Sequence, residues 1–194
     1  MEITTDIVKK LRDETGVSIM QCKKALEEAG GDLEKAKIIL RKQSSAIATK
    51  KADRALGAGT VSAYVHAGGS VVGAVVLASE TDFVSKTDDF KKLAYEIAMQ
   101  VAATKPVWID RKEVTEDDLK TAREVFTQEV ANVPEAARAK ALEGKIDSFV
   151  AERVLLNQPF IKDTSITIRE LIDQAIQKFG EKIQVVRFER LSVQ

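Results

Sequence analysis

Hydrophobic residues change their spacing along this sequence, and the changes divide it into segments of different secondary structure. Over the first forty residues they recur every three or four positions, with interruptions at Gly16 and at Gly30-Gly31. This spacing puts apolar side chains on one face of a helix, and glycine is favoured just after a helix end. The pattern therefore predicts three short helices that pack as a bundle.

Polar residues at the helix starts support this interpretation. Ser18 is followed three residues later by Gln21, the spacing of a capping box, and Asp32 is a good N-cap for the third helix. A bundle this small has a thin core. We expect it to leave three residues of the second-helix region partly exposed, namely Val17, Ile19 and Met20.

The next hydrophobic segments have the composition of strands. TVSAYVH (60–66) and VVGAVVLAS (71–79) are rich in β-branched residues and are separated by Ala67-Gly68-Gly69-Ser70, which predicts a hairpin. From Asp88 the helical period returns and lasts until Pro106. Residues 115–152 predict a helical hairpin, a further helix ends near Gly180, and KIQVVRFERL predicts a third strand.

These segments predict an α+β protein in three parts. Residues 1–41 form a three-helix module, residues 42–57 a basic linker, and residues 58–194 a core in which a small antiparallel sheet packs with helices and the hairpin. The segment RKQSSAIATKKADR (41–54) carries five basic side chains and one acidic one, and it lacks the interleaved aromatic residues that stack on bases. A solvated tether, in part helical, is therefore favoured over a nucleic-acid contact.

Composition points to the cytoplasm. Cys22 is the only cysteine, so an internal disulfide cannot form and a reducing compartment fits. No apolar run approaches the roughly 20 residues of a membrane span, and MEITTDIVKK does not resemble a targeting peptide. The 30 basic and 30 acidic residues balance, which does not indicate a nucleic-acid platform.

Residues for catalysis are scarce. His66 is the only histidine and is expected at a hairpin turn, which excludes histidine triads and histidine metal clusters. Cys22 is expected on the apolar face of a helix with no histidine to act as its base. Gly57-Ala58-Gly59 precedes a strand, the reverse of a dinucleotide fingerprint, and no phosphate-binding loop motif occurs. We expect no catalysis, no bound cofactor and no metal.

Glu80-Thr81-Asp82-Phe83-Val84-Ser85-Lys86 follows the most apolar strand. Glu80 and Asp82 share a side if the strand continues, because side chains alternate. Two such carboxylates could chelate a cation, but a solvated strand end with a helix cap is the favoured interpretation. From the pattern alone, Phe83 is an ordinary core residue.

Four segments resemble the translation elongation factor Ts family. They are LRDETGVSIMQCKKALEEAGGDLEKA (11–36), SETDFVSK (79–86), LLNQPFIKD (155–163) and VVRFERL (185–191). Their order and spacing match the family across essentially the whole chain. The resemblance implies an N-terminal module similar to ubiquitin-associated domains, followed by a core domain.

The resemblance also implies a function. Members of this family are guanine-nucleotide exchange factors of elongation factor Tu. The loop Thr81, Asp82, Phe83 and Val84 is then expected to insert beside the partner's magnesium and phosphate site. The N-terminal module is expected to dock on the partner's nucleotide-binding domain through four residues, namely Arg12, Val17, Ile19 and Met20.

This chain departs from the family pattern in several places. Val76 and Ala78 replace an acidic residue and an asparagine in the strand before the loop, which removes any polar support those residues give. Gln21 occupies a position where many relatives have aspartate. Gln100 stands near the position of a histidine on the core helix, so a contact with the partner there would rely on hydrogen bonding alone.

Other functions remain open on sequence grounds. An adaptor for ubiquitin-like partners would use the N-terminal module alone, and an RNA-binding factor would use basic residues, namely Arg41, Lys42, Lys50, Lys51 and Arg54. A metal-dependent enzyme built on Glu80 and Asp82 lacks further ligands. We also expect a non-covalent homodimer, because three strands leave a sheet edge and faces that one short chain cannot cover.

Overall fold

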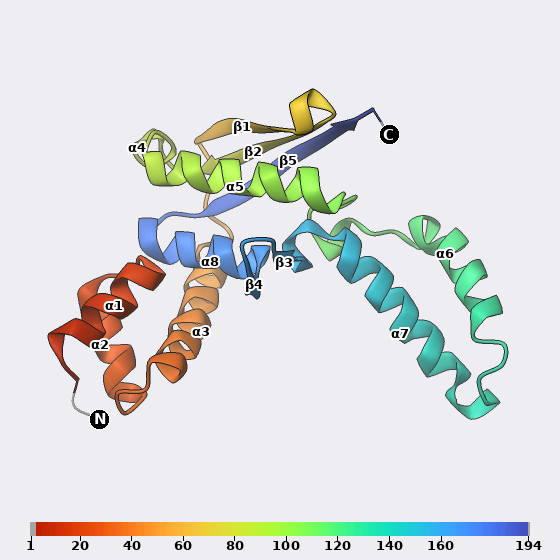
Figure 1. Ribbon diagram of the computed structural model, residues 1–194, viewed down its shortest axis with the longest axis horizontal. Helices are drawn as coiled ribbons and strands as arrows, with labels where there is room; N and C mark the ends of the chain where they lie inside the picture. Colours follow the sequence, from red (N-terminus) through yellow and green to blue (C-terminus); the bar gives the residue numbers. More distant parts are fainter. Residues whose placement is uncertain (1–2, 194) are drawn as a thin grey trace. The chain divides into compact units, whose positions relative to one another are not determined.

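The computed structural model describes residues 3–193 (Figure 1). It confirms the α+β class, with N-terminal helices and an antiparallel three-stranded sheet in the order β1-β2-β5. The strands of this sheet are β1 (Ala58–His66), β2 (Val71–Ser79) and β5 (Ile183–Ser192). The chain divides into two compact units, and β1, β2, β5 and α5 (Asp88–Thr104) contribute residues to both.

The first unit comprises Met1–Ser62, Val76–Tyr95 and Arg169–Val186. It contains α1 (Thr5–Thr15), α2 (Ile19–Glu28) and α3 (Leu33–Lys51), which are labelled in Figure 1. These three helices enclose their own hydrophobic core. The buried members of that core are Val8, Leu11, Val17, Cys22, Ala25, Leu26, Ala36 and Leu40. The expected three-helix bundle is therefore present.

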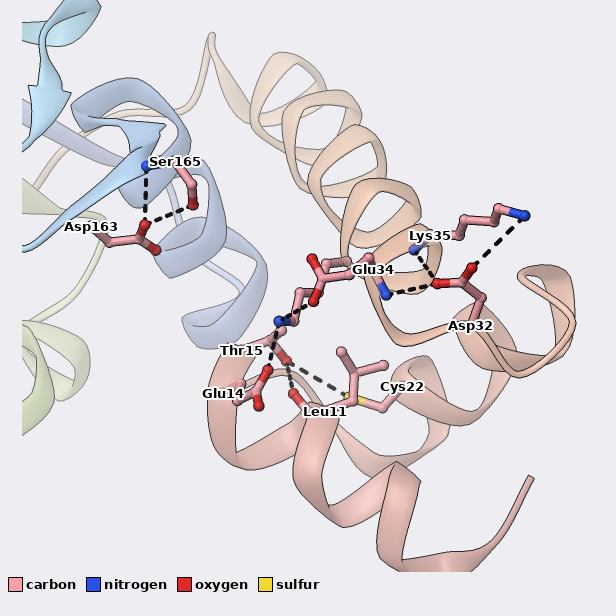
Figure 2. A network of polar contacts seen from close by, with 10 residues as sticks. Leu11, Glu14, Thr15, Cys22, Asp32, Glu34, Lys35, Asp163 and Ser165 are labelled. Atoms are coloured by element: carbon pink, nitrogen blue, oxygen red, sulfur yellow. Dashed lines mark hydrogen bonds and ion pairs between the residues drawn. The ribbon is translucent and has the colours of Figure 1, made fainter. Parts of the chain in front are cut away.

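Local capping explains where these helices begin and end. Gly16 ends α1 in the left-handed conformation (φ 67°), which costs little without a Cβ. The Ser18 hydroxyl accepts a hydrogen bond from the backbone N–H of Gln21 and caps α2. The same hydroxyl donates to the side-chain oxygen of Gln21 at 3.0 Å. Asp32 accepts from the N–H groups of Glu34 and Lys35 at the start of α3 (Figure 2).

Helix α3 is longer than the sequence predicted. It continues to Lys51, through most of the segment interpreted as a linker. Its second half packs on α8 (Ile168–Phe179), where Ser44 is buried and hydrogen-bonds Gln177. Apolar residues are few in this half, so periodicity gave little signal, and the contact partner lies 133 residues away in the chain.

The second unit comprises Ala63–Val75, Glu96–Ile168 and Arg187–Gln194. Helices α6 (Glu116–Glu129) and α7 (Glu135–Arg153) form the predicted helical hairpin (Figure 1). Its core contains Leu119, Ile146, Val150 and Val154, with Trp108 packed against it. Thr115 and Asp118 form a capping box that starts α6.

A second, two-stranded sheet was not predicted. It pairs β3 (Pro159–Phe160) with β4 (Asp163–Thr167) in antiparallel register. Asp163 accepts from the N–H and hydroxyl of Ser165, at 3.0 and 2.7 Å, at the start of β4 (Figure 2). The two residues of β3 are too few for an alternating pattern, and four of the five residues of β4 are polar, so neither strand gave a signal.

Candidate functional site

The Thr81–Val84 segment is an exposed helical turn directly after β2. Residues Asp82–Ser85 form the one-turn helix α4, and Thr81 is its N-cap residue (Figure 1). The Phe83 side chain is 85% exposed, whereas Val84 is buried at 8%. Each helical residue turns the side chain by about 100° from the last, so neighbours can face solvent and core. The pattern-based interpretation of Phe83 as a core residue is therefore wrong.

Asp82 is also on the exposed side of this turn. Its carboxylate accepts a hydrogen bond from Lys86 Nζ at 2.6 Å, a pair four residues apart. This hydrogen bond and the lysine charge lower the pKa of Asp82. The turn therefore presents a carboxylate that stays ionised at neutral pH next to an exposed aromatic ring.

Glu80 does not join Asp82 in a chelating pair. Its carboxylate accepts from the backbone N–H of Lys182 at 2.6 Å and from Arg54 at 3.2 Å, and these contacts lower the pKa of Glu80. Among residues 3–193, no group of three or more His, Cys, Asp or Glu side chains is placed to hold a metal ion.

Polar support for the turn comes from residues that the sequence did not indicate. Thr60 on β1 donates to the carbonyl of Ser85, and Ser79 donates to the carbonyl of Thr81, both at 2.9 Å. Glu181 accepts from both the N–H and the hydroxyl of Thr81, at 3.0 and 2.5 Å. Thr60 and Glu181 lie 25 and 100 residues from their partners, a separation that leaves no local signal.

Ala78 is 7% exposed and Val76 is half-buried on β2. Neither side chain can form the hydrogen bonds that an acidic residue or an asparagine would offer. The four hydrogen bonds that involve Thr60, Ser79 and Glu181 nevertheless hold the turn. The absence of polar groups at positions 76 and 78 therefore leaves the turn supported.

The turn between α1 and α2 forms a second candidate surface. Ile19 and Met20 are 61% and 69% exposed at the start of α2, as expected. The expectation for Val17 is wrong, because its side chain is 2% exposed and belongs to the bundle core. The Arg12 side chain is 52% exposed and lies 3.5 Å from Asp13.

Buried polar contacts hold this turn in shape. The Thr15 hydroxyl donates to the carbonyl of Leu11 at 2.6 Å and lies 3.8 Å from the Cys22 sulfur (Figure 2). The Cys22 thiol in turn lies 3.6 Å from the carbonyl of Val17. Burial raises the pKa of Cys22, so the thiol is an inert core group, as the sequence predicted.

The Gln100 side chain lies inside the protein rather than on its surface. It is fully buried on α5, and its amide nitrogen donates to Gln158 and to the carbonyl of Pro159. Its amide oxygen accepts from the N–H of Ile161 at 2.9 Å. The amide is therefore used inside the second unit, and a contact with a partner would require these internal hydrogen bonds to be broken.

Two of the basic residues considered for RNA binding also have internal roles. Lys51 donates to the carbonyl of Gly180 at 2.7 Å, and Arg54 pairs with Glu80. These contacts fix the end of α3 to neighbouring segments of the first unit. Lys51 and Arg54 therefore form contacts within the protein.

None of the helices in the part of the chain that the structure describes is long and apolar enough to cross a membrane.

Comparison with known proteins gives a consistent result along the chain. A sequence model of the family described as "Elongation factor TS" matches residues 3–194. The chain is 44% identical over 193 residues to a protein of Thermotoga neapolitana, covering 100% of this chain and 98% of the relative. It is 46% identical over 195 residues to a protein of Herpetosiphon aurantiacus, with 100% and 98% covered. A protein of Coprothermobacter proteolyticus is 45% identical over 192 residues, with 98% of each covered. All three relatives carry the name Elongation factor Ts.

Proposed function

The chain belongs to the elongation factor Ts family, and we propose that it is a guanine-nucleotide exchange factor for elongation factor Tu. The family gives it a role in translation elongation. Exchange requires no bond to be made or broken by this chain, so the proposed role needs neither catalytic residues nor a cofactor. The factor acts by opposing the binding of nucleotide to its partner.

The exposed Phe83 is the observation that carries the proposal. An aromatic ring that is 85% exposed leaves a large apolar surface in water. Buried aromatic anchors dominate the energy of many interfaces. In the proposed complex Phe83 inserts between elements of the partner and becomes buried there. A ring with only a packing role would be buried in the free protein instead.

Asp82 brings negative charge to the same contact. Mg²⁺ requires near-ideal octahedral geometry, so a small shift of its ligands weakens binding sharply. A carboxylate placed beside the partner's magnesium and phosphates favours such a shift. Binding of the factor and binding of nucleotide then oppose each other by an equal free energy, which makes the coupling reciprocal. GTP completes the cycle by displacing the factor.

Docking is the proposed role of the α1–α2 turn. Ile19 and Met20 offer apolar area, and Arg12 adds a charge next to it. Val17 supports docking only indirectly, because its buried side chain packs in the bundle core beneath the turn. These residues supply affinity for docking, whereas the α4 turn adds the Phe83 anchor and also acts on the nucleotide site. The proposed site of action is the cytoplasm, with a homodimer as the working form.

The direct test uses elongation factor Tu loaded with a fluorescent GDP analogue. Adding this protein together with excess unlabelled GDP is expected to accelerate loss of the fluorescent nucleotide, with a rate that saturates at high factor concentration. The control is the same mixture without the factor. An unchanged rate despite measurable binding would contradict exchange and favour the adaptor function. Salt-dependent binding to RNA in the absence of protein partners would favour the RNA-binding alternative.

A further inference from the structure

Two distant segments of the first unit exchange hydrogen bonds at the base of the α4 turn. The Glu181 carboxylate accepts from the N–H of Thr81 at 3.0 Å and from its hydroxyl at 2.5 Å. In return, the Glu80 carboxylate accepts from the N–H of Lys182 at 2.6 Å. The consecutive residues Glu80 and Thr81 are therefore hydrogen-bonded to Lys182 and Glu181, respectively.

The segment just after α3, which ends at Lys51, joins the same cluster. Arg54 pairs with Glu80 at 3.2 Å, and the Lys182 ammonium donates to the carbonyl of Arg54 at 3.0 Å. We call these residues the clasp: Arg54, Glu80, Thr81, Glu181 and Lys182. The five come from three parts of the chain, so the clasp joins the segment after α3, the strand end before α4 and the segment after α8.

The clasp matters because α4 cannot hold its own orientation. A helix of four residues has too few internal hydrogen bonds to be stable alone. Thr81 is its N-cap residue, yet the threonine side chain makes no capping bond to the helix. The Thr81 hydroxyl instead donates a hydrogen bond to the Glu181 carboxylate. The position of Thr81, and with it the direction in which Phe83 points, therefore depends on a contact 100 residues away.

We propose that Glu181 is a positioning residue for nucleotide exchange, with the clasp holding the α4 turn in the conformation that presents Phe83 and Asp82. The inference rests on the proposed exchange function and adds the group that pre-organises its acting loop. Pre-organisation lowers the ordering cost of insertion. Loss of Glu181 thus acts on the insertion step and leaves docking through the α1–α2 turn intact.

The test compares two variants at this position with a matched control. Glu181→Ala removes both acceptor oxygens. Glu181→Gln keeps the geometry, since its oxygen accepts from the Thr81 N–H and its amide donates to the Thr81 hydroxyl. Glu129→Ala removes a different partly exposed carboxylate, which pairs with Lys145 at 2.7 Å on the helical hairpin. All three are measured by fluorescent GDP release from elongation factor Tu over a range of factor concentrations.

We expect Glu181→Ala to lower the saturating release rate about fivefold to thirtyfold, the ratio that corresponds to one or two kilocalories per mole of lost positioning. The half-saturating concentration should change by less than about threefold, because docking is retained. Glu181→Gln is expected to recover most of the rate, and Glu129→Ala to match the wild type.

A second measurement does not depend on exchange activity. Hydrogen–deuterium exchange of the Thr81 amide in the isolated protein should accelerate roughly tenfold in Glu181→Ala, as expected on losing a hydrogen bond to a charged acceptor. Unchanged amide exchange together with an unchanged saturating rate would overturn the inference. A rate loss that appears only as a higher half-saturating concentration would also overturn it.

Failure of the proposed function would look different. If the wild-type protein fails to accelerate GDP release while the Thr81 amide still loses protection in Glu181→Ala, the exchange function is contradicted and the positioning of the turn by Glu181 is upheld. Melting of Glu181→Ala near the wild-type temperature shows that the readouts report on a folded chain.

Discussion

Phe83 and Phe90 lie seven residues apart and have opposite environments. Phe83 is 85% exposed, whereas Phe90 is fully buried and meets Phe179 edge to face. We expect Phe83→Ala to change the free energy of unfolding by at most about 0.5 kcal/mol, as for other exposed sites. Phe90→Ala, the control, should cost about 3–5 kcal/mol because it leaves a cavity. Thermal or urea unfolding measures both values.

The same Phe83→Ala protein should bind elongation factor Tu more weakly by about 2 kcal/mol or more, since truncation removes a buried anchor. Isothermal titration calorimetry with nucleotide-free partner measures this loss. A large loss of stability with normal affinity would show instead that the ring is structural.

Asp82 should act mainly on nucleotide release. Asp82→Ala leaves the apolar contact area of the turn in place, so affinity for the nucleotide-free partner should change little. The stimulated GDP release rate should fall, because the carboxylate no longer disturbs the magnesium site. Raising Mg²⁺ should slow the wild-type reaction and have less effect on the variant. An equal response of both proteins to Mg²⁺ would remove Asp82 from the mechanism.

At the scale of elements, we predict that the rest of the chain folds without the N-terminal bundle. Its hydrophobic core ends at Leu40, and the second half of α3 has its own contact with α8 through Ser44. Removing residues 1–41 should therefore leave the remainder folded and weaken binding to elongation factor Tu substantially. Circular dichroism and a binding titration test the two parts.

A finer version of this experiment changes only the exposed surface. The double variant Ile19→Ala and Met20→Ala should raise the half-saturating factor concentration and leave the saturating release rate unchanged. Ile38→Ala is the matched control, because Ile38 is 50% exposed on α3 of the same bundle, outside the α1–α2 turn. Equal effects of the control and the double variant would contradict docking through the turn.

The packing of α3 on α8 should make stability depend on pH. Burial raises the pKa of Asp173 on α8, although a hydrogen bond from Ser45 and the nearby Arg169 oppose the shift. The folded state therefore binds the proton more tightly than the unfolded state. The stabilisation is complete below the ordinary aspartate pKa of about 3.9 and is lost as pH rises through the raised value. Asp173→Asn should lack this decline in urea-unfolding free energy between acidic and neutral pH, and an identical pH profile for both proteins would contradict the assignment.

At the scale of the whole molecule, we predict a homodimer in which exposed valines of the sheet become buried. In the first unit, Val61 on β1 is 72% exposed and Val186 on β5 is 51% exposed. Burying such apolar strand faces against a second copy would remove them from water. Light scattering at micromolar concentration should give twice the chain mass of 21.3 kDa.

Charged substitutions test where the two copies meet. Val61→Glu and Val186→Glu should shift the scattering mass toward the monomer. Val125→Glu on the helical hairpin, where Val125 is 48% exposed, should leave it unchanged. A wild-type mass equal to one chain would refute the dimer outright.

Local patterns alone determined much of this protein. The caps at Ser18, Asp32 and Thr115 and the glycine after α1 set helix ends through bonds between near neighbours, so they could be predicted from sequence. Periodicity placed the bundle and the helical hairpin, and β-branched composition placed the three strands, because both signals are carried by residues close together in the chain. The SETDFVSK segment and its three companions were enough to indicate the family, which the comparisons then established.

Tertiary structure decided which side chains of the candidate site face solvent and what holds them there. Phe83 and Val17 are both apolar, and their one-dimensional patterns did not reveal that the first is exposed and the second buried. Gln100 is buried and hydrogen-bonded to Gln158 and Ile161, and Thr81 is hydrogen-bonded to Glu181. These contacts join residues 58 to 100 positions apart, and only the folded chain brings such residues together.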